Sequence, residues 1–396
     1  MMSIAARREL LEAVAPRYCR APRPEKERIL DEFVQTTGYA RKYAIHLLHH
    51  VPRERRPVRR RRARKYTPAA KAAVLTLWRA ANGICSKRLV PFLPELIAVL
   101  ERCGELQLEA DTKALVLQMS PATVDRLLRR ERQGHRRRGL GTTKPGTLLK
   151  RQIPIRTFAD WDETRPGFLE VDLVAHCGTT TAGEYLHTLV LTDIHTTWTE
   201  CEPLLNRSQE TVTAAIAAVR QRLPFPLLGL DSDNGSEFIN ANLVRYCQRE
   251  HITFTRSRPY KKNDQAHVEQ KNWTHVRQTV GYGRYEGPEA LEALTGLYEP
   301  LRLYMNFFQP TLKLIAKEQV GGKVRKRYDI ARTPYQRVLE CPEVSAATKA
   351  QLRALYETLN PVALLRALDR CQDRLWALER VDPQMRQRYP QSKILT

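Results

Sequence analysis

The chain has 396 residues, enough for two or three domains, and no stretch approaches the roughly 18 consecutive apolar residues that a membrane span requires. Its 66 Lys and Arg against 43 Asp and Glu give a formal net charge of +23, which indicates a nucleic-acid partner, although a basic protein that merely adheres to polyanions shares this composition. The eight cysteines are scattered without a CxxC pair, which argues against a disulfide framework or a zinc ribbon. We therefore expect a cytoplasmic protein with no membrane partner.

Residues 1–51 are predicted to form a helix-turn-helix DNA-binding domain. Apolar residues recur at helical spacing on both sides of Gly38 in the stretch RPEKERILDEFVQTTGYARKYAIHLLHH. In this interpretation the second helix carries Arg41 and Lys42 into a groove of double-stranded DNA. An ordinary helical hairpin explains the pattern equally well.

Residues 52–66 are predicted to be a basic linker. Nine of the thirteen residues from Arg53 to Lys65 are Lys or Arg, and their mutual repulsion prevents the segment from folding alone. Bound along DNA phosphates, this run would make the affinity strongly salt-dependent. The alternative is a solvated linker without a role. The residues that we expect to bind DNA are Arg59, Arg60, Arg61 and Arg62.

Residues 67–132 are predicted to form a second helical DNA-binding domain, followed by a Gly-rich basic linker at 133–157. The stretch SPATVDRLLRRER begins with Ser120 as a plausible N-cap and Pro121 at the first helical position. Its apolar residues lie opposite a basic face, so it is the better candidate for a recognition helix. The expected DNA contacts on this face are Arg126, Arg129 and Arg130.

Residues 158–285 are predicted to form an α/β core. Strand-like stretches at 168–176, 185–195 and 196–204 indicate an antiparallel meander, and a helix at 208–223 leads to a buried strand at 225–233. A further helix at 236–250 and a short strand at 252–257 complete a mixed five-stranded sheet.

Acidic residues are concentrated in this core. From Phe168 to Thr255 the chain has five Arg, no Lys and eleven Asp or Glu, and such an acidic region can meet a phosphate polymer only with a cation between them. Asp172 lies in the middle of the first strand and Asp233 at the carboxyl end of the fourth, where ligands of α/β sheets gather. Glu269 follows after 35 residues, in a helix whose expected N-cap is Asn263 or Asp264.

The ordered motifs LEVDLV, DSDNGSEF and SRPYKKNDQAHVEQKN, with Asp, Asp and Glu at this spacing, resemble the integrase core shared by retroviral integrases and bacterial insertion-sequence transposases. The resemblance covers residues 160 to 285 closely. The N-terminal histidines have no CxxC partner with which to form the zinc-binding domain of retroviral integrases, which favours the bacterial DDE transposases.

The resemblance implies a ribonuclease-H-like catalytic core in which Asp172, Asp233 and Glu269 are both the catalytic residues and the metal ligands. They would hold two Mg²⁺ ions, for which Mn²⁺ could substitute, and hard cations of this kind prefer carboxylate oxygen. A metal pair stabilises both the attacking and the leaving oxygen of a phosphoryl displacement, so no protein nucleophile is required.

Two kinds of residue are expected to support this site. Asp231 shares a strand face with Asp233, and we expect it to act as a supporting carboxylate, with direct metal ligation as the alternative; Asn234 helps the chain to turn off the strand. A basic loop and the helix after it are expected to clamp DNA beside the carboxylates, the alternative being solvated loop charge. The expected DNA contacts there are Arg256, Arg258, Lys261, Lys262 and Lys271.

Residues 286–396 are predicted to be mostly helical, with a hairpin around Gly321 and Gly322 whose second arm is basic. Their amphipathic helices suit a partner subunit or packing on the core, and we expect a homo-oligomer, a dimer or tetramer, on DNA. The function that follows is that of a DDE transposase, which cleaves the ends of its mobile element and joins them to target DNA. The alternatives are a catalytically silent DNA-binding regulator and a ribonuclease-H-like nuclease that cuts without joining.

Overall fold

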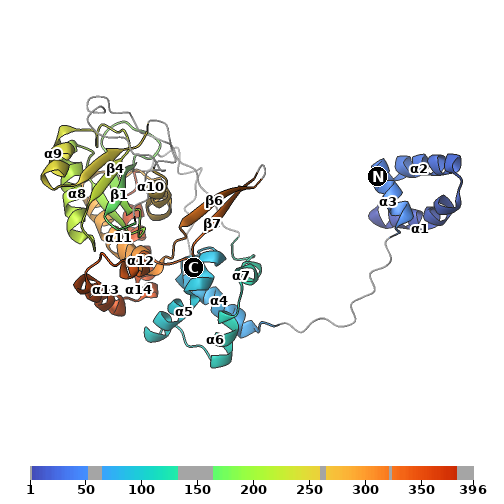
Figure 1. The fold of residues 1–396 in the computed structure, drawn as a ribbon, viewed down its shortest axis with the longest axis horizontal. Coiled ribbons are helices and arrows are strands. Elements are labelled where there is room, and N and C mark those ends of the chain that lie inside the picture. The colour runs from blue at the N-terminus through green and yellow to red at the C-terminus, as the bar shows by residue number, and fades with distance from the viewer. Residues whose placement is uncertain (1, 52–64, 133–163, 259–264, 321–322, 381–396) are drawn as a thin grey trace. The chain divides into compact units, whose positions relative to one another are not determined.

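The computed structural model describes residues 2–51, 65–132, 164–258, 265–320 and 323–380. The chain divides into two compact units, Met1–Lys65 and Tyr66–Thr396, and each is considered by itself (Figure 1). The predicted linker 133–157 lies outside the described residues, as do Arg59 to Arg62 of the predicted linker 52–66. No helix in the described parts of the chain is both long and apolar enough to cross a membrane.

The N-terminal unit consists of three helices around one small core. They are α1 (Ile4–Arg20), α2 (Arg23–Thr37) and α3 (Arg41–His49). The predicted helical pair corresponds to α2 and α3, and Gly38 ends α2 in the left-handed conformation, with φ of 72°. Helix α1 was not predicted. Leu11, Ala15 and Tyr18 lie one turn apart on it and pack against the other two helices, so the unit has the third helix that a hairpin lacks.

A mixed five-stranded sheet in the order β3-β2-β1-β4-β5 lies at the centre of the second unit. The strands are β1 (Phe168–Ala175), β2 (His187–Asp193), β3 (Thr199–Leu204), β4 (Gly229–Ser232) and β5 (Thr253–Arg256). The first three pair antiparallel, whereas β4 and β5 run parallel to β1. This arrangement confirms the predicted meander and the parallel strands that follow it.

Helices surround this sheet and extend beyond it. The helices of the sheet region are α8 (Gln209–Arg222), α9 (Ala241–Arg249), α10 (Ala266–Lys271) and the π-helical turn η3 (Asn272–Arg277). The chain before the sheet forms α4 (Pro68–Ala80), α5 (Ser86–Arg102), α6 (Ala110–Leu117) and α7 (Pro121–Leu127). The chain after it forms α11 (Gly287–Phe308), α12 (Pro334–Glu340), α13 (Ala346–Thr358) and α14 (Pro361–Ala377).

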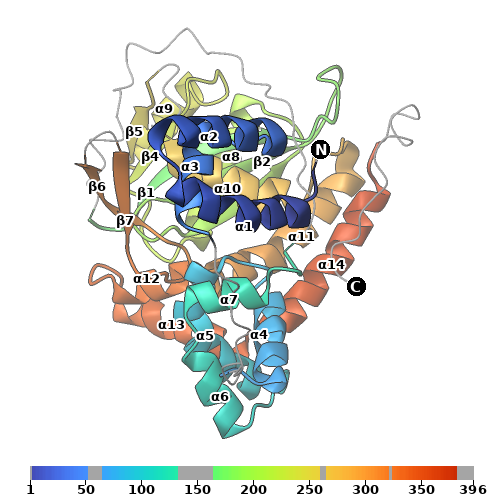
Figure 2. The same cartoon turned by 90° about the vertical axis from the view of Figure 1, so that its right-hand side faces the viewer.

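Helices α4–α7 belong to the same compact unit as the sheet. The Tyr304 hydroxyl of α11 donates to the Ala80 carbonyl at 2.8 Å, and the Tyr356 hydroxyl of α13 donates to Glu95 Oε1 at 2.7 Å. Figures 1 and 2 both show α4–α7 beside the C-terminal helices. Residues 67–132 therefore share one hydrophobic core with the sheet and the C-terminal helices.

The predicted recognition helix is shorter than expected. Ser120 accepts a hydrogen bond from the Thr123 N–H at 3.3 Å and Pro121 begins α7, as predicted, but the helix ends at Leu127. Arg129 and Arg130 lie beyond its end, so the continuous basic helical face that the sequence suggested does not form.

A two-stranded ribbon stands apart from the main sheet. Its strands β6 (Leu314–Val320) and β7 (Lys323–Tyr328) pair antiparallel, which confirms the hairpin predicted around residues 321–322. Figure 1 shows the ribbon extending outward from the body of the second unit.

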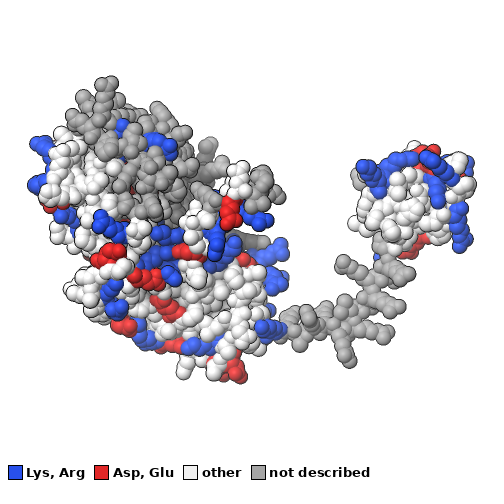
Figure 3. Space-filling view, viewed as in Figure 1, with Lys and Arg blue, Asp and Glu red and all other residues white. Residues whose placement is uncertain are grey.

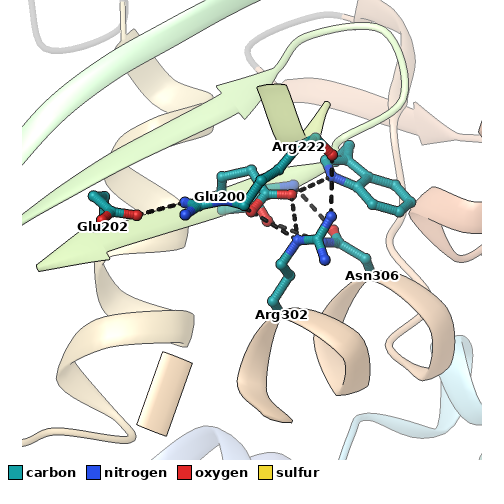
Figure 4. A network of polar contacts seen from close by, with 7 residues as sticks. Glu200, Glu202, Arg222, Arg302 and Asn306 are labelled. Carbon is teal, nitrogen blue, oxygen red and sulfur yellow. Dashed lines mark hydrogen bonds and ion pairs between the residues drawn. The ribbon is translucent and has the colours of Figure 1, made fainter. Parts of the chain in front are cut away.

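A buried carboxylate joins the sheet to α11 (Figure 4). Glu200 of β3 is only 1% exposed, and Arg302 Nε donates to both of its carboxylate oxygens, at 2.7 and 2.9 Å. The indole of Trp198 donates to the same carboxylate at 2.8 Å, and Arg222 of α8 lies 3.6 Å from it. Three elements are thereby fixed around one charge.

Replacing Arg302 by Ala should lower the free energy of unfolding by about 3 kcal/mol, because it removes the main partner of a buried charge. Arg374→Ala is the matched control, since Arg374 pairs with Glu292 on the surface, where such pairs contribute about 0–1 kcal/mol. Urea unfolding followed by circular dichroism measures both. Equal losses in the two variants would contradict the role given to Glu200.

Candidate active site

Asp172 and Asp233 lie on two adjacent parallel strands, Asp172 in the middle of one and Asp233 at the carboxyl end of the other. Asp172 is in β1, and Asp233 directly follows β4. The register pairs Val171 with Ser232, so the two aspartates occupy the next position on adjacent strands. Both predictions about where these residues lie in the sheet are confirmed.

Helix α10 brings Glu269 to the same region through two hydrogen bonds to β1. The Val268 N–H donates to Glu170 Oε2 at 2.6 Å, and one turn further on Asn272 Nδ2 donates to Asp172 Oδ2 at 2.7 Å. Glu269 lies between these two attachment points. The N-cap of α10 is Gln265 rather than Asn263 or Asp264, which lie outside the described residues.

The charges of the three carboxylates act on one another. Burial, and after it the charge of Asp233 and more weakly that of Glu269, raises the pKa of Asp172 from 3.8 to about 7. The N–H of Leu173 and the Asn272 side chain act in the opposite sense. The carboxylates are thus close enough for their mutual repulsion to disfavour full ionisation. Bound cations would offset this repulsion.

The described residues do not contain three His, Cys, Asp or Glu side chains already grouped as metal ligands. Asp172 and Asp233 instead accept local hydrogen bonds, Asp172 from Asn272 and Asp233 Oδ1 from the Gly235 N–H at 2.8 Å. Carboxylate oxygens are nevertheless the donors that Mg²⁺ prefers, and burial, followed by the charge of Asp233, raises the pKa of Asp172. The residue types and their electrostatics fit a divalent cation.

A second pair of carboxylates lies one step deeper in the sheet. Glu170 and Asp231 face each other in the register of β1 and β4 and are 0% and 3% exposed. Burial raises the pKa of Glu170 well above its usual value, and the charge of Asp231 raises it further. Thr255 donates to Asp231 Oδ1 at 2.5 Å, so Asp231 is held away from solvent beneath the surface carboxylates.

The turn after β4 holds Asp233 in place. Asn234 donates to the Ser257 carbonyl at 2.9 Å and accepts from Arg256 at 3.0 Å, which ties the turn to the end of β5. A Cβ on Gly235 would lie 2.9 Å from Asp233 Oδ1, so a side chain here would force the Asp233 carboxylate to shift.

Two residues that we expected to contact DNA are buried. Lys271 is 5% exposed and Arg256 is 8% exposed, so neither can lie along a DNA backbone, and these two predictions are wrong. Lys271 is three residues after the fully buried Val268 and therefore shares the inward face of α10. Arg256 stabilises the turn through Asn234. Helical periodicity could have excluded Lys271, because Glu269 lies on the opposite face.

The other expected DNA contacts are distributed over the surface. Arg41 forms an ion pair with Asp31, Lys42 is exposed at the start of α3, and Arg126 donates to Thr123. Arg129, Arg130 and Arg258 are exposed. Lys261 and Lys262 lie outside the described residues.

Asn272 was not identified from the sequence. It lies one helical turn after Glu269 and begins η3, and π-helical turns of this kind are frequent at functional sites. The spacing of four residues from Val268 was the available signal, because it puts Asn272 on the face of the helix that meets β1.

Residues 162–262 match the protein family described as "Integrase core domain". The "Uncharacterized protein y4rM" of Sinorhizobium fredii (strain NBRC 101917 / NGR234) is 47% identical over 330 residues, which cover 83% of this chain and 93% of that protein. The chain belongs to the same family as y4rM and carries an integrase core domain, which is characteristic of polynucleotidyl transferases.

Two solved structures match this chain with low sequence identity and low TM-scores. The catalytic core domain of BIV integrase is 17% identical, with a TM-score of 0.26, over 43% of this chain and 91% of that chain. A chain of a simian T-cell lymphotropic virus intasome in complex with PP2A regulatory subunit B56 gamma is 15% identical, with a TM-score of 0.27, over 42% of this chain and 55% of that chain. The strand order of the sheet, together with the family match, confirms the predicted ribonuclease-H-like fold.

Without a divalent cation, Asp172→Asn should be more stable than the wild type at pH 8, with a melting temperature higher by on the order of 3 °C. A carboxyl whose pKa rises from 3.8 to about 7 on folding stabilises the protein fully only below pH 3.8, and this contribution is lost as the pH rises to 7. The new amide can donate to Asn272 Oδ1, which has no hydrogen-bond partner among the described residues, after a flip of that side chain.

Thermal unfolding of both proteins between pH 5 and pH 8 measures this effect. The stability difference should widen with rising pH. A difference that stays constant over this range would contradict the electrostatic cost assigned to Asp172.

Gly235→Ala should lower the free energy of unfolding by roughly 1–3 kcal/mol, because its Cβ would overlap Asp233 Oδ1 and the Glu237 carboxyl group. Gly296→Ala is the control, since no atom lies within 4 Å of the added Cβ in the middle of α11. That variant should gain about 1 kcal/mol from helix propensity. Urea unfolding distinguishes them, and a neutral Gly235→Ala would disprove the steric constraint.

Proposed function

We propose that the protein is a DDE transposase that binds the ends of a mobile DNA element, exposes their 3′-hydroxyls and joins them to target DNA. It acts as a homo-oligomer, a dimer or tetramer, on double-stranded DNA. The integrase core domain supplies the class of reaction. The observation that carries the proposal is the placement of Asp172 and Asp233 at neighbouring positions on β1 and β4, with the segment that carries Glu269 hydrogen-bonded to β1.

Asp172, Asp233 and Glu269 would hold two Mg²⁺ ions, or Mn²⁺ in their place. When bound, these ions supply Lewis-acid stabilisation to the oxygen that attacks the phosphorus and to the oxygen that leaves. Cleavage and joining are then both phosphoryl transfers, and neither needs a nucleophile from the protein.

The chain's own residues prepare the site for this role. Asn272 holds one oxygen of Asp172, and the Gly235 N–H holds one oxygen of Asp233, so each carboxylate keeps its orientation. Burial raises the pKa of Glu170 well above its usual value, which disfavours a second full negative charge beside Asp231. Asp231 serves as a support beneath the ligands.

Long-range attraction to DNA comes from the rest of the chain. The acidic core would repel a phosphate backbone, whereas the whole molecule carries a formal net charge of +23. Lys42, Arg129 and Arg130 are exposed and available for phosphate contacts, and Arg258 is also exposed. We propose the same role for Arg41 and Arg126, and for the basic residues 59–62 and 261–262.

Replacing Asp172 by Asn, Asp233 by Asn or Glu269 by Gln should each lower Mg²⁺-dependent cleavage and joining by at least about 100-fold, because each change removes a charged metal ligand. DNA binding without Mg²⁺ should be retained. The assay incubates the purified protein with labelled DNA of the repeats that flank its gene, and separates nicked from joined products. Glu210→Gln, an exposed carboxylate on α8, is the matched control and should stay active.

The outcomes separate the alternatives. Full activity in all three variants would disprove the assignment of the active site. Nicked products without joined products from the wild type would indicate a nuclease that does not join. Specific binding to the repeats without any cleavage would indicate a regulator.

A further inference from the structure

We propose that the ribbon of β6 and β7 is a second DNA-binding element, which lies in the major groove of duplex DNA. The inference rests on the proposed function, because the DNA concerned is the DNA on which the enzyme acts. It adds a contact surface that is separate in sequence from the helices and from the carboxylate site.

The base of the ribbon is firmly attached to the core. Lys313 Nζ donates to the His195 carbonyl at 2.6 Å, and the Thr311 and Thr197 hydroxyls lie 2.9 Å apart. Asp329 accepts from the Lys313 N–H at 2.7 Å and forms an ion pair with Arg337 of α12 at 2.8 Å. These contacts join the ribbon to the turn between β2 and β3, so its orientation within the second unit is fixed.

The ribbon itself is strongly basic. From Leu314 to Tyr328 the sequence has five Lys or Arg and one Glu. Arg325, Lys326 and Arg327 are exposed, and none of them forms an ion pair with another described residue. Figure 3 shows Lys and Arg gathered on the side of the second unit where the ribbon extends. Exposed cations in this number could neutralise several DNA phosphates.

The charge is present on both faces of the ribbon. Successive residues of a strand point to opposite faces, so Arg325 and Arg327 lie on one face and Lys326 on the other. A ribbon that lay flat on a protein partner would need charge on only one face. A ribbon in a groove turns one face toward the bases, and cations on both faces allow phosphate contacts whichever face that is.

Exposed apolar residues accompany these cations. Ile315 and Val324 are each 60% exposed and Tyr328 is 48% exposed. A two-stranded sheet has no core in which such side chains could be buried. Apolar side chains of this kind can contact thymine methyl groups and the faces of sugars. They distinguish this surface from an ordinary solvated basic loop.

The dimensions of a β-ribbon agree with the proposed partner. Paired strands lie roughly 4.8 Å apart, and the major groove of B-DNA is about 12 Å wide and admits a two-stranded ribbon. Among the described residues, the ribbon is attached at its base and extends away from the core (Figure 1), which is the arrangement that entry into a groove requires.

The test compares two triple variants with the same change in charge. One is Arg325→Gln with Lys326→Gln and Arg327→Gln in the ribbon. The control is Arg353→Gln with Arg370→Gln and Arg374→Gln, which removes three exposed arginines from α13 and α14. Fluorescence anisotropy measures the binding of each full-length protein to a random 30-base-pair duplex over a range of salt concentrations, without divalent cation. Thermal unfolding and sedimentation velocity record stability and oligomeric state.

We expect the ribbon variant to bind at least about 10-fold more weakly at 150 mM salt, with a slope of log affinity against log salt that is smaller by about 2 to 3. The control variant should keep the wild-type slope. Equal slopes in the ribbon variant and the wild type would overturn the inference and leave the proposed function intact. A ribbon variant that changes oligomeric state but not slope would overturn it in favour of a contact between copies of the chain. A wild type that binds no DNA would disprove the proposed function itself.

Discussion

The attachment of α10 to β1 is the contact on which the candidate active site depends. Glu269 is far from both aspartates in the sequence, and no strand carries it to the sheet. Its position follows from the Val268 N–H bonded to Glu170 and the Asn272 amide bonded to Asp172, with the fully buried Val268 side chain between them. Both acceptors are carboxylates of the same strand face, so β1 positions the third acidic residue and also provides the first.

Bringing these carboxylates together costs electrostatic free energy, and the raised pKa values of two of them limit that cost. Four carboxylates, two at the surface of the site and two beneath it, lie within the same few residues of β1 and β4. The raised pKa values of Glu170 and Asp172 reduce the number of negative charges present together in the absence of a cation. The site is therefore stable only to the degree that protons, hydrogen bonds or cations neutralise it, which is characteristic of sites selected for function rather than for stability.

The sequence predicted most of this arrangement where a short-range rule applied. The alternation of residues along strands placed Asp172 and Asp233, and the cap and proline at Ser120 and Pro121 placed the start of α7. Prediction from the sequence failed where the position of a residue depended on packing between distant segments. The charge of Lys271 suggested a DNA contact, but the helix face that it shares with Val268 is buried against the sheet. Asn272 could be identified as part of the site only from its hydrogen bond to Asp172 of β1.

Under the proposed function, the distribution of charge would allow an acidic site to act on a polyanionic substrate. The carboxylates lie in the sheet, whereas the exposed cations lie on elements that surround it, including α7 and the β6–β7 ribbon. Because α4–α7, the sheet and the C-terminal helices share one core, with α8 and α11 further joined to β3 through Glu200, these cations stand at fixed positions relative to Asp172 and Asp233. DNA held by the outer cations would be brought to the carboxylates in one orientation, and the local repulsion would be overcome only where a divalent cation sits between carboxylate and phosphate. In the proposed function, this repulsion would oppose the entry of the DNA backbone into the site unless the metal ions were bound.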